Sequence, residues 1–168
     1  MQRRIRVGII TASDSAYRGE RQDESGPLIA ATVEKAGMEV VHQKVLPDDE
    51  GALAVEMKYM ADGLGLDVVL TTGGTGLGPR DRTPEATRAI IDREVPGIAE
   101  ALRAAGLRKT PHAMLSRGVA GVRGSTLIVN LPGSPRAVQE SLEVLLPALG
   151  HAVELLQGQA VDCARLRR

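Results

Sequence analysis

Cysteine and aromatic residues are almost missing from this sequence. Cys163 is the only cysteine among 168 residues, so no disulfide can form within the chain, and a reducing compartment is expected. Three histidines without a cysteine pair argue against a structural zinc site. The only aromatic side chains are those of Tyr17 and Tyr59. A heterocyclic ligand would therefore be recognised by main chain, aliphatic walls and small polar side chains.

Long apolar runs and a net charge are also missing. No run approaches the roughly 18 residues that a membrane span needs. The first ten residues, MQRRIRVGII, lead into a strand pattern without the apolar segment of a signal peptide. The 21 Lys and Arg residues balance 21 Asp and Glu residues, which gives no signature of nucleic-acid or membrane binding. We expect a soluble, cytoplasmic protein that binds neither nucleic acid nor membranes.

The length and the 43% of apolar residues suit one domain, over residues 1–168, with 159–168 as a flexible C-terminal tail. Strand and helix patterns alternate along the chain and predict an α/β fold, with a mostly parallel sheet and helices on both faces. Segment 112–124 is compatible with either a strand or a short helix. Strands are predicted at 4–13, 39–46, 67–72 and 125–131, and helices at 27–36, 52–64, 83–94, 98–107 and from 135 onward, with a kink or break at Pro147.

Polar or glycine-rich segments follow four of the predicted strands. They are SDS (13–15), LPDDE (46–50), TTGGTGLGPRD (71–81) and NLPGSP (130–135). Because parallel strands end at the same edge of a sheet, these segments are expected to meet there. Open α/β sheets bind their ligands at this edge. The sequence therefore predicts a single site.

The third segment has four glycines within residues 73–78, followed by Arg80 and Asp81. Successive main-chain N–H groups in such a loop can bind an anion, and a helix start downstream favours phosphate. Gly78 is followed by Pro79 rather than by the Lys of a Walker loop, and Pro79 also breaks the dinucleotide pattern G-x-G-x-x-G. The loop is a phosphate-binding candidate of another type, or a plain turn from a strand to a helix.

Two further segments are weaker candidates. Ser134 and Pro135 are typical of an N-cap and first helical residue, so the helix start could bind phosphate or carboxylate, or simply be capped. Ser116 and Arg117 precede a glycine and pair a hydroxyl group with a cation, although a surface turn explains them as well.

Carboxylates at two of the strand ends indicate a magnesium site. Mg²⁺ takes oxygen ligands and is commonly shared with substrate phosphates, which suits Asp48 and Asp81. Capping of the next helix is the alternative for Asp48 or Asp49, and a solvated charge cluster is the alternative for Asp81. The sequence shows neither a Ser-His-Asp order nor a Cys-His pair, so no residue stands out as a general base. Phosphoryl or nucleotidyl transfer fits this absence, because a phosphate nucleophile is already ionised.

Three segments follow one another in the order TTGGTG, RDRTPEAT and LSRGVAGVRGSTLIVNLPGSP. Together they resemble the molybdopterin adenylyltransferase (MogA/MoaB) family, which includes the N-terminal domain of gephyrin. ITASDS, DESGPLI, LPDDE and DREVPGIAEALR add to the resemblance, which covers about residues 4–157. It implies a three-layer α/β/α sandwich. It also implies molybdenum cofactor biosynthesis, in which Mg-ATP adenylylates molybdopterin and pyrophosphate is released.

The resemblance carries over to individual residues. It implies that Asp81 and Asp48 are the catalytic acids and hold Mg²⁺. The positions that it implies for binding ATP and molybdopterin are Ser13, Asp14, Ser15, Thr72, Gly73, Gly74, Thr75, Gly76, Ser116, Arg117, Gly118, Asn130, Pro132, Gly133 and Ser134.

The family also sets expectations about partners and about an alternative function. A homotrimer, or a hexamer, is implied, with transient contact to a separate MoeA-type protein that inserts molybdate. Some MoaB-type members lack one of the acids or the asparagine, whereas this chain has Asp48, Asp81 and Asn130. These residues favour the catalytic branch. A non-catalytic molybdopterin-binding or scaffold protein is the alternative.

Overall fold

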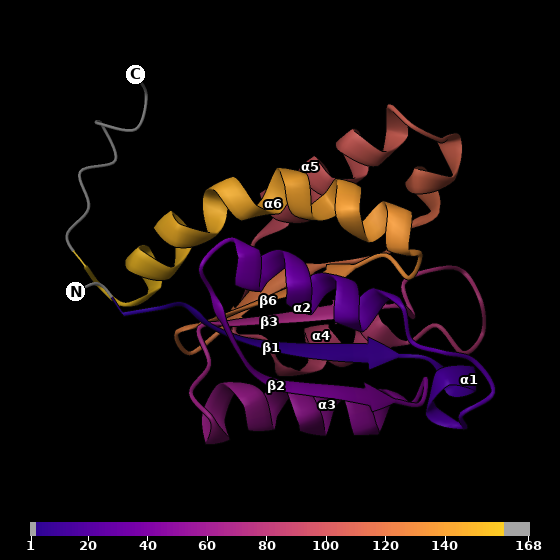
Figure 1. Cartoon of the computed structure of the whole chain (residues 1–168), viewed down its shortest axis with the longest axis horizontal. Coiled ribbons are helices and arrows are strands. Elements are labelled where there is room, and N and C mark those ends of the chain that lie inside the picture. Colours follow the sequence, from indigo (N-terminus) through magenta and orange to yellow (C-terminus); the bar gives the residue numbers. More distant parts are fainter. Residues whose placement is uncertain (1–2, 160–168) are drawn as a thin grey trace.

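The computed structural model describes residues 3–159 as a three-layer α/β/α sandwich around a mostly parallel sheet (Figure 1). This agrees with the predicted fold class. The sheet has six strands in the order β2-β1-β3-β6-β5-β4. Their bounds are β1 Arg6–Ala12, β2 Glu39–Leu46, β3 Val68–Thr72, β4 Arg93–Glu94, β5 Ala120–Arg123 and β6 Thr126–Leu131. The helices are α1 Asp14–Tyr17, α2 Ser25–Lys35, α3 Glu50–Lys58, α4 Thr83–Ile90, α5 Pro96–Leu107 and α6 Pro135–Leu156, with a π-helical turn η1 Tyr59–Gly63 and a 3₁₀ turn η2 Pro111–Leu115.

Strands β2, β1, β3 and β6 run parallel to one another, while β5 is antiparallel to β6 and to β4. A tight turn explains the change of direction. Residues 124 and 125 connect β5 to β6, and Gly124 has a φ of +58°, which side-chain-bearing residues rarely adopt. The open question over segment 112–124 is resolved by this hairpin, since the segment contains both η2 and β5.

Alternating side chains of the strands supply two separate cores. On one face Ile9 and Leu70 pack with side chains of α2 and α6, and on the other face Ile10 and Val69 pack with side chains of α3 and α4. Figure 1 shows α2, α5 and α6 on one side of the sheet and α3 on the opposite side. Near-continuous apolar strands are expected where both faces are covered.

Several predicted boundaries were wrong. Helix α2 begins at Ser25 rather than at Pro27, and neither the short α1 nor the two-residue β4 was predicted. The helix predicted at 83–94 is α4, which ends at Ile90, and its first residue, Thr83, donates its hydroxyl group to the carbonyl oxygen of Gly73 at 3.0 Å. Pro147 does not break α6, whose flanking Leu145 and Leu149 remain buried in the core.

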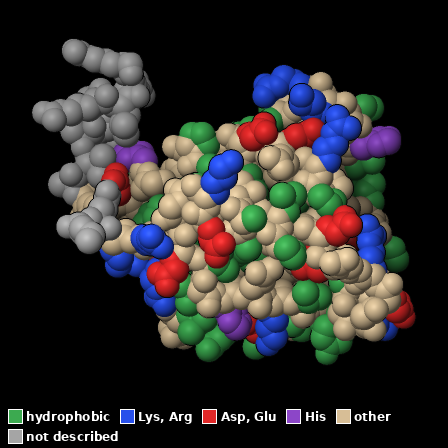
Figure 2. Space-filling view, viewed as in Figure 1, with side chains coloured by type: hydrophobic (Ala, Val, Ile, Leu, Met, Phe, Trp, Pro, Cys, Tyr) green, Lys and Arg blue, Asp and Glu red, His purple; other side chains and the backbone are tan. Residues whose placement is uncertain are grey.

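Figure 2 shows acidic and basic side chains interspersed over the face viewed. Within residues 3–159 no helix combines the length and apolar character needed to cross a membrane. Of the predicted C-terminal tail, residues 160–168 lie outside the described part, whereas Gln159 donates its main-chain N–H to the carbonyl oxygen of Glu154.

Candidate functional site

The four polar segments meet at one edge of the sheet, as the sequence predicts. The chain leaves β1 toward β2 on one side, and β3 lies on the other side of β1, so this edge is the topological switch point. The ends of β1 and β3 approach closely at Gly73. A Cβ atom on Gly73 would lie 2.3 Å from the carbonyl oxygen of Ala12, and its φ is +90°. Only glycine fits this position.

Two clefts open at this edge and share Gly73, Gly133 and Ser134 as a common wall. The larger cleft has a volume of about 560 Å³ and lies between the glycine loop and the helices α5 and η2. Its apolar wall includes Ala99, Leu102, Ala113 and Leu115. The smaller cleft has a volume of about 320 Å³ and lies between the end of β1 and the start of α2. Two adjacent clefts could hold two substrates side by side.

Most of the predicted site residues line these clefts. They are Ser13, Thr72, Gly73, Gly74, Thr75, Gly76, Asp81, Ser116, Gly118, Asn130, Pro132, Gly133 and Ser134. Asp14, Ser15, Asp48 and Arg117 are not among the lining residues but lie next to them. The prediction of convergence is therefore confirmed by the geometry, while the individual binding roles stay predictions.

The glycine loop folds against the start of α4. Thr83 donates its main-chain N–H to the carbonyl oxygen of Gly74 at 3.1 Å, besides its hydroxyl contact with Gly73. A Cβ atom on Gly74 would lie 2.3 Å from Thr83 Oγ1 and 3.2 Å from Asp48 Oδ1. The missing side chain thus leaves the space between α4 and the Asp48 carboxylate open.

Asp48 and Asp14 join the ends of β2 and β1. The main-chain N–H of Asp14 donates to Asp48 Oδ2, the main-chain N–H of Asp48 donates to Asp14 Oδ1, and Arg80 binds Asp14 through two nitrogens at 3.0 Å. Burial raises the pKa of Asp48, and the neighbouring charges of Asp14 and Asp81 add to this. The hydrogen bonds from Arg80 lower the pKa of Asp14. Two adjacent carboxylates thus have pKa values shifted in opposite directions.

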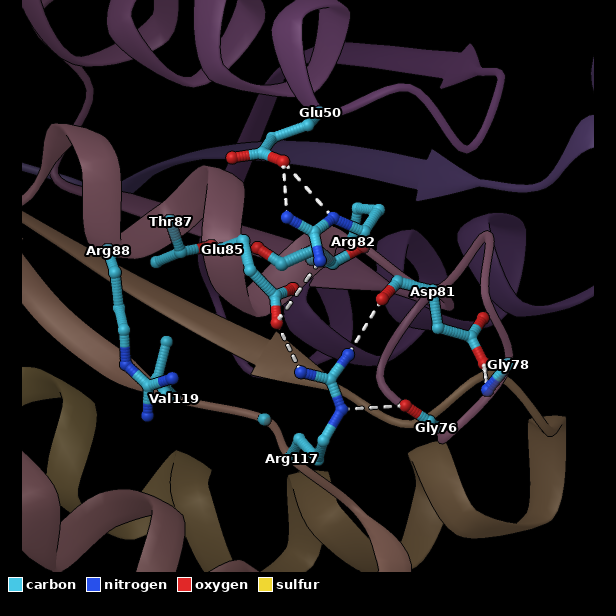
Figure 3. A network of polar contacts seen from close by, with 12 residues as sticks. Glu50, Gly76, Gly78, Asp81, Arg82, Glu85, Thr87, Arg88, Arg117 and Val119 are labelled. Carbon is cyan, nitrogen blue, oxygen red and sulfur yellow. Dashed lines mark hydrogen bonds and ion pairs between the residues drawn. The ribbon is translucent and has the colours of Figure 1, made fainter.

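Asp81 is held by its own loop. Its Oδ2 accepts a hydrogen bond from the main-chain N–H of Gly78 at 2.9 Å (Figure 3). Among the described residues, no hydrogen bond reaches Asp81 Oδ1 or Asp48 Oδ1. Residues 3–159 also hold no group of three or more His, Cys, Asp or Glu side chains arranged for a metal. Two available carboxylate oxygens fit Mg²⁺, which binds through one or two carboxylates and completes its shell with water and substrate phosphates.

Arg117 has its contacts on the protein itself. Its guanidinium group donates to the carbonyl oxygens of Gly76 and Asp81 and pairs with Glu85 (Figure 3). Arg103, on α5, holds the same segment from the other side through the carbonyl oxygens of Ser116 and Gly118. The segment 116–118 is therefore fixed between α5 and the glycine loop.

Asn130 is only 4% exposed, and the protein occupies both ends of its amide. Its nitrogen donates to the hydroxyl groups of Thr71 at 3.0 Å and Thr87 at 2.9 Å, and its oxygen accepts from the main-chain N–H of Val119 at 3.1 Å. These bonds connect β6 to β3, to α4 and to the start of β5. The geometry gives Asn130 an organising part in the site.

The sequence interpretation missed residues that the smaller cleft contains. Arg21, Asp23 and Ser25 line it, and Ser25 donates to the carbonyl oxygen of Gly133 at 2.7 Å. Asp23 accepts hydrogen bonds from Thr11 and from the main-chain N–H of Gly26. Arg21 and Asp23 belong to the loop between α1 and α2, and Ser25 is the first residue of α2. All three follow the end of β1, so the same strand-end argument could have included them.

Comparison with known proteins decides the family. A family model described as "Probable molybdopterin binding domain" matches residues 8–151. The chain belongs to this family. The molybdopterin adenylyltransferase of Haemophilus influenzae is 41% identical over 172 residues, which cover 94% of this chain and 87% of that protein. This agrees with the resemblance seen in the sequence motifs.

A solved structure and a longer relative support the same family. The structure of MoaB from Thermus thermophilus, described as a molybdopterin biosynthesis enzyme, is 54% identical with a TM-score of 0.87, and the match covers 94% of this chain and 99% of that one. The Drosophila melanogaster protein named "Molybdenum cofactor synthesis protein cinnamon" is 38% identical over 163 residues. That match covers 96% of this chain but only 27% of the longer protein.

Proposed function

We propose that this protein adenylylates molybdopterin in molybdenum cofactor biosynthesis, using Mg-ATP and releasing pyrophosphate. The observation that carries the proposal is the pair of clefts that meet at Gly73 and Gly133, with Asp48 and Asp81 beside the glycine loop. The Haemophilus influenzae relative is named a molybdopterin adenylyltransferase, which supports the transfer of an adenylyl group to molybdopterin.

The proposed reaction transfers the adenylyl group of ATP to the terminal phosphate of molybdopterin. An oxygen of the terminal phosphate of molybdopterin attacks the α-phosphorus of ATP, and the bond from that phosphorus to the oxygen shared with the β-phosphate breaks. The electron pair leaves with pyrophosphate. The nucleophile is ionised at neutral pH, so alignment and charge neutralisation matter more than proton removal.

The residues of the chain would divide this work. The main-chain N–H groups around Gly73 and Gly74 would contact phosphate oxygens, and the capped start of α6 at Ser134 would favour a second anion. Asp48 and Asp81 would hold Mg²⁺, which when bound supplies positive charge to the phosphates. The apolar wall at Leu102 and Leu115 would exclude water from the larger cleft.

The assembly and location belong to the same proposal. We infer a cytoplasmic homotrimer, or a hexamer, whose product passes to a separate MoeA-type protein. Large apolar side chains are available for self-association, among them Leu77 at 66% and Met114 at 61% exposed. Sedimentation velocity measures the assembly, and a monomer at micromolar concentration would contradict it.

One assay tests the reaction. The protein is mixed with molybdopterin, Mg²⁺ and ATP labelled in the α-phosphate, and both labelled adenylyl-molybdopterin and pyrophosphate are measured. We expect equal amounts of the two products. No product under conditions in which the Haemophilus influenzae enzyme is active would reject the proposal. Pterin binding without ATP binding, measured by calorimetry, would identify a non-catalytic molybdopterin-binding protein instead.

A further inference from the structure

The glycine loop continues into an exposed segment, called the excursion, and the side chain of Arg117 contacts both ends of it. Residues 77–80 are exposed, whereas Gly76 and Asp81 at the two ends are partly buried. Arg117 Nε donates to the carbonyl oxygen of Gly76 at 2.8 Å, and Arg117 Nη2 donates to the carbonyl oxygen of Asp81 at 2.7 Å. A single planar guanidinium group thus sets the distance between the two ends.

The guanidinium group is itself anchored from several directions. Its Nη1 pairs with Glu85 in the first turn of α4, and this hydrogen bond lowers the pKa of Glu85. The main-chain N–H of Arg117 donates to the carbonyl oxygen of Thr75 at 2.8 Å. Figure 3 shows the Arg117 side chain, from the segment between η2 and β5, directed toward Asp81, Gly76 and Glu85. Its position is therefore fixed relative to both the glycine loop and α4.

The orientation of the Asp81 carboxylate depends on the shape of this loop. Asp81 Oδ2 accepts from the main-chain N–H of Gly78, and the main-chain N–H of Asp81 donates to the carbonyl oxygen of Gly78 at 3.0 Å. The other side-chain link of the excursion is the ion pair of Arg80 with Asp14, in which Arg80 is 64% exposed. This pair links the excursion to Asp14 of α1 and does not join the two ends of the excursion to each other. Arg117 is only 32% exposed and binds main-chain oxygens.

We propose that Arg117 is a positioning residue, which holds the ends of the 76–81 loop together and thereby fixes the Asp81 carboxylate. The part played by Asp81 rests on the proposed function. Lysine cannot replace arginine in this role, because an ammonium group is a point charge and cannot present three nitrogens in one plane. The substitution Arg117→Lys keeps the positive charge and removes the planar set of three donor nitrogens.

The first measurement is hydrogen exchange on the free protein. We expect the amides of Gly78 and Asp81 to exchange at least several-fold faster in Arg117→Lys than in the unmodified protein. Arg123→Lys is the matched control. Arg123 also donates to a carbonyl oxygen, that of Ile90 at 2.7 Å, and pairs with a carboxylate, that of Asp62, at the far edge of the sheet. This control should leave the 76–81 amides unchanged.

The second measurement is the dependence of the reaction on Mg²⁺. In Arg117→Lys we expect kcat to fall by about tenfold to a hundredfold, as for partners that orient metal ligands. The Mg²⁺ concentration for half-maximal rate should rise, while KM for molybdopterin changes less than about twofold. Loss of folded protein alone would lower the rate without moving the Mg²⁺ dependence.

A double-mutant comparison decides whether Arg117 acts through Asp81. In an Asp81→Asn background, Arg117→Lys should lower kcat no further. An equal decrease in both backgrounds, or unchanged exchange of the loop amides, would overturn the proposal. If Arg117→Lys does not fold, Glu85→Gln replaces it and should give the same changes in smaller measure. Inactivity of the unmodified protein would reject only the proposed function, because hydrogen exchange still decides the role of Arg117.

Discussion

Asp14 and Asp48 exchange hydrogen bonds, because the main-chain N–H of each donates to the carboxylate of the other, at 3.0 and 2.9 Å. This reciprocal pair fixes the end of β1 against the end of β2. Arg80 neutralises Asp14 through two of its nitrogens, whereas no described residue forms an ion pair with Asp48. The negative charge of Asp48 is therefore left for a cation.

The stability of the protein should depend on pH through the charge of Asp48. Burial raises the pKa of Asp48, so the folded state binds its proton more tightly than the unfolded state does. Stability consequently falls as pH rises from the ordinary Asp pKa of about 3.9 through the raised pKa of Asp48. Asp48→Asn removes this loss while keeping an oxygen for Asp14. We expect the variant to have a higher Tm than the unmodified protein at pH 7 and an equal Tm near pH 3.

The matched control for this comparison is Asp49→Asn. Asp49 caps α3 by accepting from the main-chain N–H of Ala52 at 2.7 Å, and asparagine caps equally well. Its Tm should follow that of the unmodified protein at both pH values. Scanning calorimetry without Mg²⁺ measures all three proteins. A lower Tm for Asp48→Asn at pH 7 would show that the buried charge does not destabilise the metal-free fold.

Asp81→Asn should abolish most of the adenylyl transfer without unfolding the chain. Its side chain lies at the exposed loop and contributes one hydrogen bond, from Gly78, which an amide oxygen can also accept. The loss of charge beside the phosphates should lower kcat by about 100-fold or more. Mg²⁺ together with ATP should raise the Tm of the unmodified protein more than that of the variant. A variant with full activity would remove Asp81 from the mechanism.

The sequence predicts the position of this site better than the role of its residues. Parallel strands bring their ends to one edge whatever the intervening helices do, so Ser13, Asp48, Gly73 and Ser134 could be placed together from strand patterns alone. After β1 the predicted site includes only residues 13–15, which explains why Asp23, in the loop 18–24, was not recognised. Its place in the smaller cleft depends on how α2 packs on the sheet.

The direction in which each side chain points could not be predicted from the sequence. Arg117 and Asn130 both belong to segments that reach the site, yet the guanidinium group of Arg117 and the amide of Asn130 make their contacts with protein atoms. No spacing rule distinguishes an arginine that binds a ligand from one that braces a loop. The antiparallel edge was likewise missed, since β4 has two residues and no pattern of its own.

Gly73→Ala tests the close approach at the switch point. The new Cβ atom would meet the carbonyl oxygen of Ala12 at 2.3 Å, and the φ of +90° is strained for alanine. We expect a loss of about 2 kcal/mol or more in the free energy of unfolding, together with loss of activity. Gly150→Ala is the control, since a Cβ atom there meets nothing within 4 Å inside α6. It should stabilise the protein by about 0.5–1 kcal/mol. Urea unfolding compares the two, and equal stabilities would contradict the packing seen at Gly73.

Asn130→Ala distinguishes an organising residue from a ligand-binding one. The substitution leaves the main-chain N–H of Val119 without its acceptor and the hydroxyl groups of Thr71 and Thr87 without their donor, all in buried positions. A buried group without a partner costs about 1–3 kcal/mol, so the free energy of unfolding should fall by at least this amount.

Gln159→Ala, which removes an exposed side chain, is the control and should change the free energy of unfolding by less than about 0.5 kcal/mol. Urea unfolding of the ligand-free protein separates the two roles, because a side chain that only binds substrate leaves this stability unchanged. If Asn130→Ala were as stable as the unmodified protein but bound ATP or molybdopterin more weakly, Asn130 would be a ligand-binding residue. A large loss of stability with unchanged affinity in the folded fraction would establish that Asn130 holds β3, β6 and α4 in register beneath the glycine loop.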